Sequence, residues 1–177
     1  QTMLGIALGE RRGVDGVPFA DLRRALERVA EAGQSFLDGL EDTVAKLAKD
    51  YKDATAWLLV GSGPHYFSAR EGTLKIEEQA ILTGKAYRTG DFHHGVLSQL
   101  AAERAVVAIE AGGAANERVV DAVRAAREGQ SPTIAVTWSG SDGATELERH
   151  ADHTITMAPA LPELISPIPM TLVFQLL

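Results

Sequence analysis

The chain has 177 residues, of which 45% are hydrophobic, and its 17 Lys and Arg against 24 Asp and Glu give a net charge of −7. This length and apolar content support one sizeable core, and the acidic balance disfavours nonspecific binding to nucleic acid or to an anionic membrane. The absence of cysteine excludes disulfides and thiolate chemistry, and the five scattered histidines do not suggest a structural zinc site. The apolar stretches near residues 1–8 and 168–177 are too short to span a bilayer, so we expect a cytoplasmic protein.

The first 54 residues show helical patterns. The opening stretch QTMLGIALGERRG ends in two arginines and a glycine, which is a common C-terminal signature of a helix. Apolar residues then recur at helical spacing from about residue 18 to 53, and a second helix is expected to begin near Ser35. Both ends of the sequence lie within apolar patterns, so we expect a segment of a longer chain, with residues 1–54 as a helical lead-in.

The pattern changes from residue 55 to 177, where short apolar runs alternate with amphipathic ones. The strands expected are AWLLVG, KAYRTG, RAVVAIE, PTIAVTW and HTITM, and the helices expected lie at about 65–83, 91–100, 115–129 and 162–177. Near-continuous apolar strands joined by helical crossovers indicate a parallel sheet covered on both faces. We therefore predict an α/β domain with a doubly wound, five-stranded parallel sheet, whose ligands lie at the carboxyl ends of the strands.

Two loops of this domain contain residues that often contact ligands. In LLVGSGP, two glycines precede an expected helix start, and the backbone amides there favour an anion. The same residues also make an ordinary tight turn, and both the full dinucleotide-binding fingerprint and the Walker lysine are absent. A second polar loop, TWSGSDGAT at 137–145, has the same two interpretations.

Titratable residues gather on the expected helix after LLVGSGP and after the next strand. Glu71, Lys75 and Glu78 share one helical face, either as an exposed salt-bridge ladder or as part of an active site. The stretch TGDFHHG then places His93 and His94 beside the end of a strand, where packing does not require them.

The stretch EGTLKIEEQAILTGKAYRTGDFHHGVL resembles the second sugar isomerase (SIS) domain of glucosamine-6-phosphate synthase and related proteins. In that family a Glu-Gly-x-Leu-Lys-x-x-Glu helix is followed by a Gly-Glu-x-x-His-Gly loop, and the spacing between the second glutamate and the histidine agrees without a gap. The similarity extends over nearly all of residues 56–177, and QTMLGIALGERRG is similar to the last helix of the preceding SIS copy.

The resemblance implies roles for individual residues. Glu78 falls on the general base that moves a proton between C1 and C2 of a hexose 6-phosphate, and His94 on the histidine that assists ring opening across a subunit interface. Lys75 matches a lysine near the sugar, whereas Glu71 and His93 match no catalytic role. A carboxylate and an imidazole suit such proton transfers near neutral pH, and a neighbouring lysine would keep the glutamate ionised and attract a phosphate. The resemblance thus implies a sugar-phosphate substrate, no metal or other cofactor, and a homodimer with its site near the interface.

One departure from the family pattern concerns phosphate binding. The family holds the phosphate with a Ser/Thr-rich turn of the first SIS copy, and the counterpart here, EAGGAAN at 110–116, contains no hydroxyl. We therefore expect the phosphate-binding residues in a first SIS copy.

Two classes of function remain open. The first is an enzyme, either a sugar-phosphate isomerase, an amino-sugar synthase or a fructosamine-phosphate deglycase, and an upstream glutaminase domain would indicate the synthase. The second is a noncatalytic module that senses a sugar phosphate, which an attached helix-turn-helix segment would support.

Overall fold

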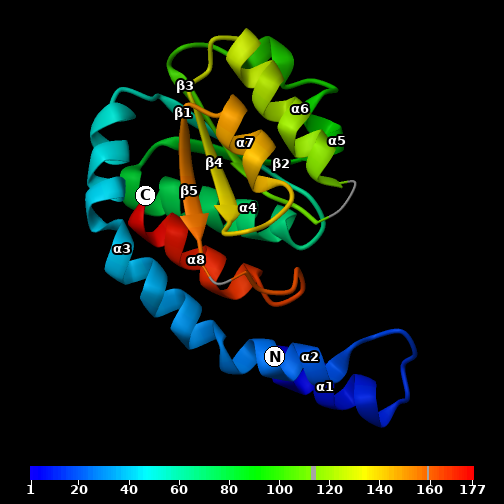
Figure 1. Cartoon of the computed structure of the whole chain (residues 1–177). Helices are drawn as coiled ribbons and strands as arrows, with labels where there is room; N and C mark the ends of the chain where they lie inside the picture. Colours follow the sequence, from blue (N-terminus) through cyan, green and yellow to red (C-terminus); the bar gives the residue numbers. More distant parts are fainter. Residues whose placement is uncertain (113–114, 159) are drawn as a thin grey trace.

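A five-stranded sheet forms the centre of the molecule, in a computed structural model that describes residues 1–112, 115–158 and 160–177. The strands all run parallel in the order β2-β1-β3-β4-β5 (Figure 1). Their bounds are β1 Ala56–Gly61, β2 Thr83–Arg88, β3 Arg104–Ile109, β4 Thr133–Trp138 and β5 His153–Met157. The predicted doubly wound α/β fold is confirmed, and the strand order reverses between β1 and β3, where such sheets open a crevice at their carboxyl edge.

Helices cover both faces of this sheet, because successive side chains of a strand point to opposite sides. Leu59 and Val107 belong to the core beneath α3, α4 and α8, whereas Leu58 and Val106 pack toward α5 and α6, and α7 lies on that second side (Figure 1). The helix bounds are α3 Val29–Asp50, α4 His65–Lys75, α5 Thr89–Phe92, α6 Ala115–Glu128, α7 Ala144–His150 and α8 Pro167–Leu176.

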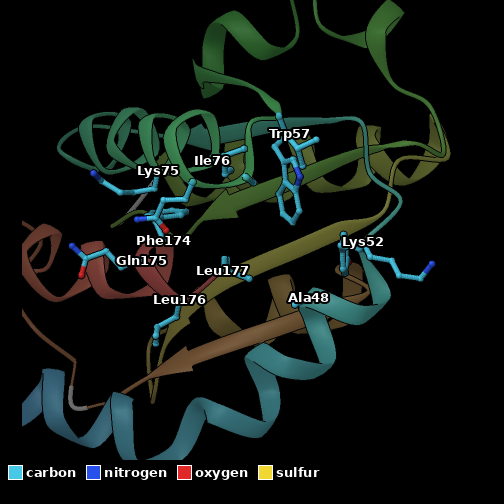
Figure 2. A pocket seen from close by; sticks show the side chains of 13 residues that line it. Ala48, Lys52, Trp57, Lys75, Ile76, Phe174, Gln175, Leu176 and Leu177 are labelled. Atoms are coloured by element: carbon cyan, nitrogen blue, oxygen red, sulfur yellow. The ribbon is translucent and has the colours of Figure 1, made fainter.

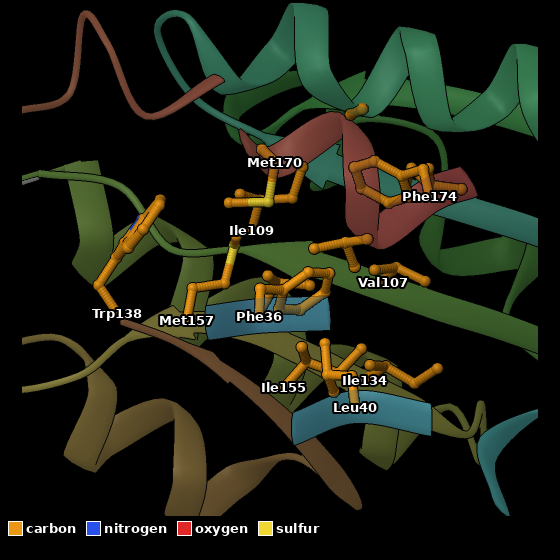
Figure 3. Packing of buried hydrophobic residues seen from close by; sticks show 14 of the residues in the cluster. Phe36, Leu40, Val107, Ile109, Ile134, Trp138, Ile155, Met157, Met170 and Phe174 are labelled. Carbon is orange, nitrogen blue, oxygen red and sulfur yellow. The ribbon is translucent and has the colours of Figure 1, made fainter. Parts of the chain in front are cut away.

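The larger core lies between the sheet and the helices α3 and α8. Side chains of β3, β4 and β5 pack there against two residues from α3 and two from α8, and most of these side chains are under 5% exposed. Figure 3 shows this packing, with Phe36 and Leu40 from α3, Met170 and Phe174 from α8, and Val107, Ile109, Ile134, Ile155 and Met157 from the sheet. Both faces of the central strands are buried, which explains the near-continuous apolar runs in the sequence.

The N-terminal helices lie to one side of the sheet. α1 (Thr2–Arg11) and α2 (Phe19–Glu27) pair through Ile6, Leu22 and Ala25, and α3 continues from them toward the sheet (Figure 1). The helix break expected near Ser35 is wrong, because the chain turns at Arg28 and remains helical through Gly33. There the missing side chain lets Leu172 of α8 approach closely, since a Cβ on Gly33 would lie 3.1 Å from its Cδ1.

Three other segments differ from the expected elements. The helix expected at 91–100 is reduced to the four-residue α5 and a 3-10 turn at Leu97–Gln99, since Gly90 and Gly95 weaken helix formation. α7 was not expected, because the turn-forming residues before it concealed the start of a short helix. The last helix begins at Pro167 rather than at residue 162, at the first helical position that suits proline. In the described ranges, no helix has the length and apolarity required to cross a membrane.

Candidate functional site

Lys75 lies between two carboxylates at the end of α4. Its Nζ is 3.0 Å from Glu78 Oε2 and 3.7 Å from Glu71 Oε1. The lysine side chain is 20% exposed and that of Glu78 is 52% exposed, so the ammonium is partly enclosed while the glutamate faces solvent. The hydrogen bond to Glu78 raises the pKa of Lys75 above its ordinary value, which keeps it cationic at neutral pH. Glu71, Lys75 and Glu78 therefore lie together on one face, as their spacing in the sequence predicts.

Glu78 is carried by an irregular turn. α4 ends at Lys75 and continues as a π-helical turn, η1 (Ile76–Ala80), where the sequence predicted a regular helix to residue 83. The turn closes at Ile81, whose φ of 55° is left-handed and whose N–H bonds to the carbonyl of Ile76. A β-branched residue in this conformation is strained, and single π turns are frequent at functional sites. The extra residue in the turn changes the direction of Glu78 relative to a regular helix.

A cavity of about 330 Å³ lies beside Lys75, between the C-terminal ends of α3 and α8 and the turn η1. Figure 2 shows Trp57 reaching into it, with Lys75 and Gln175 at one end and Lys52 at the other. Within the part of the chain that the structure describes, the indole Nε1–H of Trp57 has no hydrogen-bond partner. This nitrogen is itself buried, so the cavity offers an apolar wall and a cationic rim, at a size within the range of small-molecule sites.

The Lys75–Glu78 pair lies at the amino edge of the sheet. Thr83, the first residue of β2, pairs with Ala56, the first residue of β1, and α4 runs back along these strands before β2 begins. The pair therefore lies at the edge opposite to the carboxyl ends where we expect ligands, because the last turn of a crossover helix returns to the amino edge.

His94 lies at the other end of β2. It follows the short helix α5, which the fully buried Phe92 anchors, and its own side chain is exposed. Its backbone N–H donates to the carbonyl of Asp91 over 3.1 Å, and His93 is half-buried against the Phe92 ring. A strand of this length spans about 16 Å, so one chain brings Lys75 and Glu78 together but holds His94 at the opposite edge.

The loop after β1 also lies at the carboxyl edge. Ser62 is tied to Thr89 by a 2.7 Å hydrogen bond between their hydroxyls, and Gly63 takes a left-handed φ of 52°. The carboxylate of Glu163 faces this loop, because a Cβ on Gly63 would lie 3.1 Å from its Oε1 and one on Gly112 would lie 3.4 Å from its Oε2. A carboxylate at this place disfavours the phosphate contact considered for the loop. Of the stretch 110–116, residues 113–114 lie outside the described residues.

A buried acid that the sequence did not predict, Glu110, follows β3 directly and is 6% exposed. Its Oε2 accepts hydrogen bonds from the backbone N–H of Trp138 at 2.9 Å and from the hydroxyl of Ser141 at 2.8 Å. Burial raises the pKa of Glu110 above its ordinary value. The available signal was a glutamate that closes the apolar run RAVVAIE. In the ranges that the structure describes, no three His, Asp or Glu side chains are arranged to hold a metal ion.

Comparison with known proteins places this geometry in a family. Residues 51–177 match the SIS domain family. The glutamine--fructose-6-phosphate aminotransferase [isomerizing] of Corynebacterium diphtheriae is 30% identical over 182 residues, which cover 98% of this chain and 28% of that protein. The chain thus spans little more than a quarter of the length of this relative.

Solved structures with the same fold include a domain of an enzyme and a domain of a transcription factor. The C-terminal domain of glucosamine-fructose-6-phosphate aminotransferase from Francisella tularensis has a TM-score of 0.79 at 19% identity, over 89% of this chain and 44% of that chain. The sugar isomerase domain of the RpiR transcription factor from Sphaerobacter thermophilus has a TM-score of 0.63 at 17% identity, over 90% of this chain and 87% of that chain. With a family match over residues 51–177, which is most of its sequence, the chain belongs to the SIS domain family.

Proposed function

We propose that the chain acts on a hexose 6-phosphate or an amino-sugar phosphate by moving a proton between C1 and C2, through an enediol or enolamine intermediate. The observation that carries this proposal is the 3.0 Å contact between Lys75 Nζ and Glu78 Oε2, in which Lys75, but not Glu78, lines a cavity of suitable size. The name of the Corynebacterium diphtheriae relative, an isomerizing aminotransferase of fructose 6-phosphate, supports the same chemistry.

Each side chain has a defined part in this reaction. Glu78 removes a proton from one of the two carbons and returns it to the other, which requires an ionised carboxylate near a carbon acid. Lys75 attracts the anionic sugar phosphate and offsets the negative charge that develops on the intermediate. An imidazole such as His94 exchanges a proton with the ring oxygen when the sugar opens.

His94 would enter the site of a neighbouring copy. Within one chain it lies at the far end of β2 from Glu78, about 16 Å along the strand, whereas acid–base groups act within hydrogen-bond reach of one substrate. We propose a homodimer in which Glu78 of one copy and His94 of the other face the same sugar.

The division of the chain follows the same proposal. Residues 1–54, with α1, α2 and α3, would form a helical lead-in, of which α3 packs on this chain's own sheet and α1 and α2 would pack on a preceding SIS copy; residues 55–177 would form the second SIS domain. This assignment agrees with the exposure of Met3 and Leu4, which are 76% and 62% exposed on α1. The phosphate would then be held by residues of the first copy.

Two alternatives share parts of this site. A fructosamine-phosphate deglycase, like an amino-sugar synthase, would use the same base, so Glu78 does not separate these reactions. A noncatalytic module that senses a sugar phosphate agrees with the likeness to a transcription factor domain, which shows the fold alone. A base at the position of Glu78 favours the enzyme, because binding by itself requires none.

Proton exchange tests the proposal. The intact protein is incubated in D₂O with fructose 6-phosphate or glucosamine 6-phosphate, and NMR follows deuterium at C1 and C2. We expect exchange with the wild type and with Glu77→Gln, a matched control on the same π turn, and none with Glu78→Gln. Exchange that survives in Glu78→Gln would show that another group is the base, and absence of exchange in the wild type would favour the sensor.

A further inference from the structure

Ile81 closes the π turn η1 in a backbone conformation that its side chain disfavours. Its φ of 55° is left-handed, and in the described ranges the only other non-glycine residue with a positive φ is the unbranched Gln130. A left-handed backbone crowds the Cβ of any L-residue, and a second branch on that carbon adds to the crowding. The side chain of Ile81 is also 87% exposed, so packing does not offset the strain. The fold of this chain therefore does not explain why an isoleucine is held in this conformation.

The local sequence of the turn favours a regular helix. Residues 77–80 are good helix formers, and the sequence predicts a helix to residue 83. In the structure the N–H groups of Ile81 and Leu82 instead both approach the carbonyl of Ile76, the second over 3.5 Å. Of the five residues in η1, only Ile76 is buried. Strained conformations persist where their surroundings fix them, and this turn has little packing that could do so.

The same turn forms one wall of the cavity beside Lys75. Ile76, Gln79 and Ala80 line that cavity, whereas the side chain of Glu78 lies outside the lining that the described residues form and is 52% exposed. The proposed base thus faces solvent, beside the place where a substrate would lie. A regular helix winds more tightly than a π turn, so a return to regular winding would rotate Glu78 about the helix axis toward the place that Gln79 now has.

We propose that Ile81 is a positioning residue, which lets η1 change between the π form and a regular form that carries Glu78 toward the cavity. Its strain raises the free energy of the π form, so the regular form is populated and a sugar phosphate can select it. The change leaves the core in place, because Ile76 is the one buried residue of the turn. This inference rests on the proposed role of Glu78 as the base.

Replacement of Ile81 by glycine should trap the π form. Glycine adopts a positive φ without strain and is a poor helix former, so it stabilises the π form and disfavours the regular one. The population of the regular form should fall by at least about fivefold. An apparent affinity falls with the population of the form that binds, and a saturating ligand restores that form. We therefore expect Ile81→Gly to raise the KM for proton exchange by at least about fivefold and to leave kcat near the wild-type value.

The experiment measures deuterium entry into fructose 6-phosphate by NMR, with the intact protein and a range of sugar concentrations. Ile81→Val keeps a β-branched side chain and should match the wild type, whereas Ile81→Asn should lie between valine and glycine, because asparagine tolerates the left-handed region. Methyl relaxation dispersion of Ile76, at the buried start of the turn, follows exchange between the two forms on the μs–ms timescale. We expect dispersion in the wild type and in Ile81→Val, and a smaller amplitude in Ile81→Gly.

Three results would overturn the proposal. They are an equal KM in Ile81→Gly and Ile81→Val, a lower kcat in Ile81→Gly at an unchanged KM, and the absence of dispersion at Ile76 in the wild type. If the wild type exchanges no deuterium, the proposed reaction at Glu78 fails, and the dispersion still decides the inference about the turn. An amplitude that weakens in Ile81→Gly would then support the two forms, and an equal amplitude in both chains would contradict them.

Discussion

Acidification should destabilise the contact between α4 and α8 through His65. This residue is 2% exposed, with its Nε2 3.0 Å from the Ser166 hydroxyl of the α8 N-cap and its Nδ1 3.4 Å from that of Ser68. Burial lowers the pKa of His65 from 6.5 to about 4. Because the folded-state pKa is depressed, the unfolded chain takes up the proton first as the pH falls. The stabilisation is therefore complete above pH 6.5 and is lost as the pH falls toward 4.

The size of this effect follows from the two pKa values. Their difference corresponds to about 3 kcal/mol of unfolding free energy, of which about 2 kcal/mol is lost by pH 5. The assay is urea unfolding of the 177-residue chain, followed by circular dichroism between pH 5 and 8, for the wild type and for His65→Gln. The glutamine cannot titrate, so the gap in stability between the two chains should narrow by about 2 kcal/mol from pH 8 to pH 5. A gap that stays constant with pH would refute a buried, neutral His65.

Three further changes have expected outcomes. Gly72→Ala should lower the free energy of unfolding by about 1–3 kcal/mol, because the new Cβ would lie 2.6 Å from side-chain atoms of the core. In the control Gly39→Ala, the new Cβ meets nothing within 4 Å, so this change should raise the free energy of unfolding by up to about 1 kcal/mol in the same urea assay. Tyr51→Phe should cost about 1–3 kcal/mol, because a buried carbonyl of β4 loses the 2.9 Å hydrogen bond from the hydroxyl; an unchanged urea midpoint would contradict this. Lys75→Met should weaken the binding of fructose 6-phosphate, measured by calorimetry, at least tenfold, or by about 1.4 kcal/mol. Equal weakening by Lys52→Met, at the other end of the pocket, would contradict a specific role of Lys75 in binding the sugar phosphate.

The sheet was the part of the fold that the sequence predicted best. The strands AWLLVG and HTITM were placed with the bounds of β1 and β5, because buried parallel strands are continuous apolar runs. The short helices were predicted less well, since α7 is only seven residues long and leaves no clear periodicity. The π turn at Ile76–Ala80 was also missed, because it depends on how η1 packs before β2 rather than on local propensity.

The candidate site was predicted in part. The contact between Lys75 and Glu78 followed from helical spacing, and the roles of these residues followed from the family resemblance alone. Their position at the amino edge was not anticipated, because the rule for open sheets concerns loops that follow strands, and this pair ends a crossover helix. Glu110 was missed because one acid at a strand end becomes informative only when its burial and its partners are known.

The most direct test of the proposed shared site mixes two inactive subunits. Glu78→Gln and His94→Gln chains of the intact protein are co-expressed in equal amounts, and sugar-phosphate turnover is compared with that of each variant alone. If Glu78 of one copy works with His94 of the other, half of the dimers are mixed and each has one intact site, so turnover should recover to about one quarter of the wild-type value. Turnover no higher than that of the single variants would contradict the account, because it would mean that both residues act within one chain or not at all.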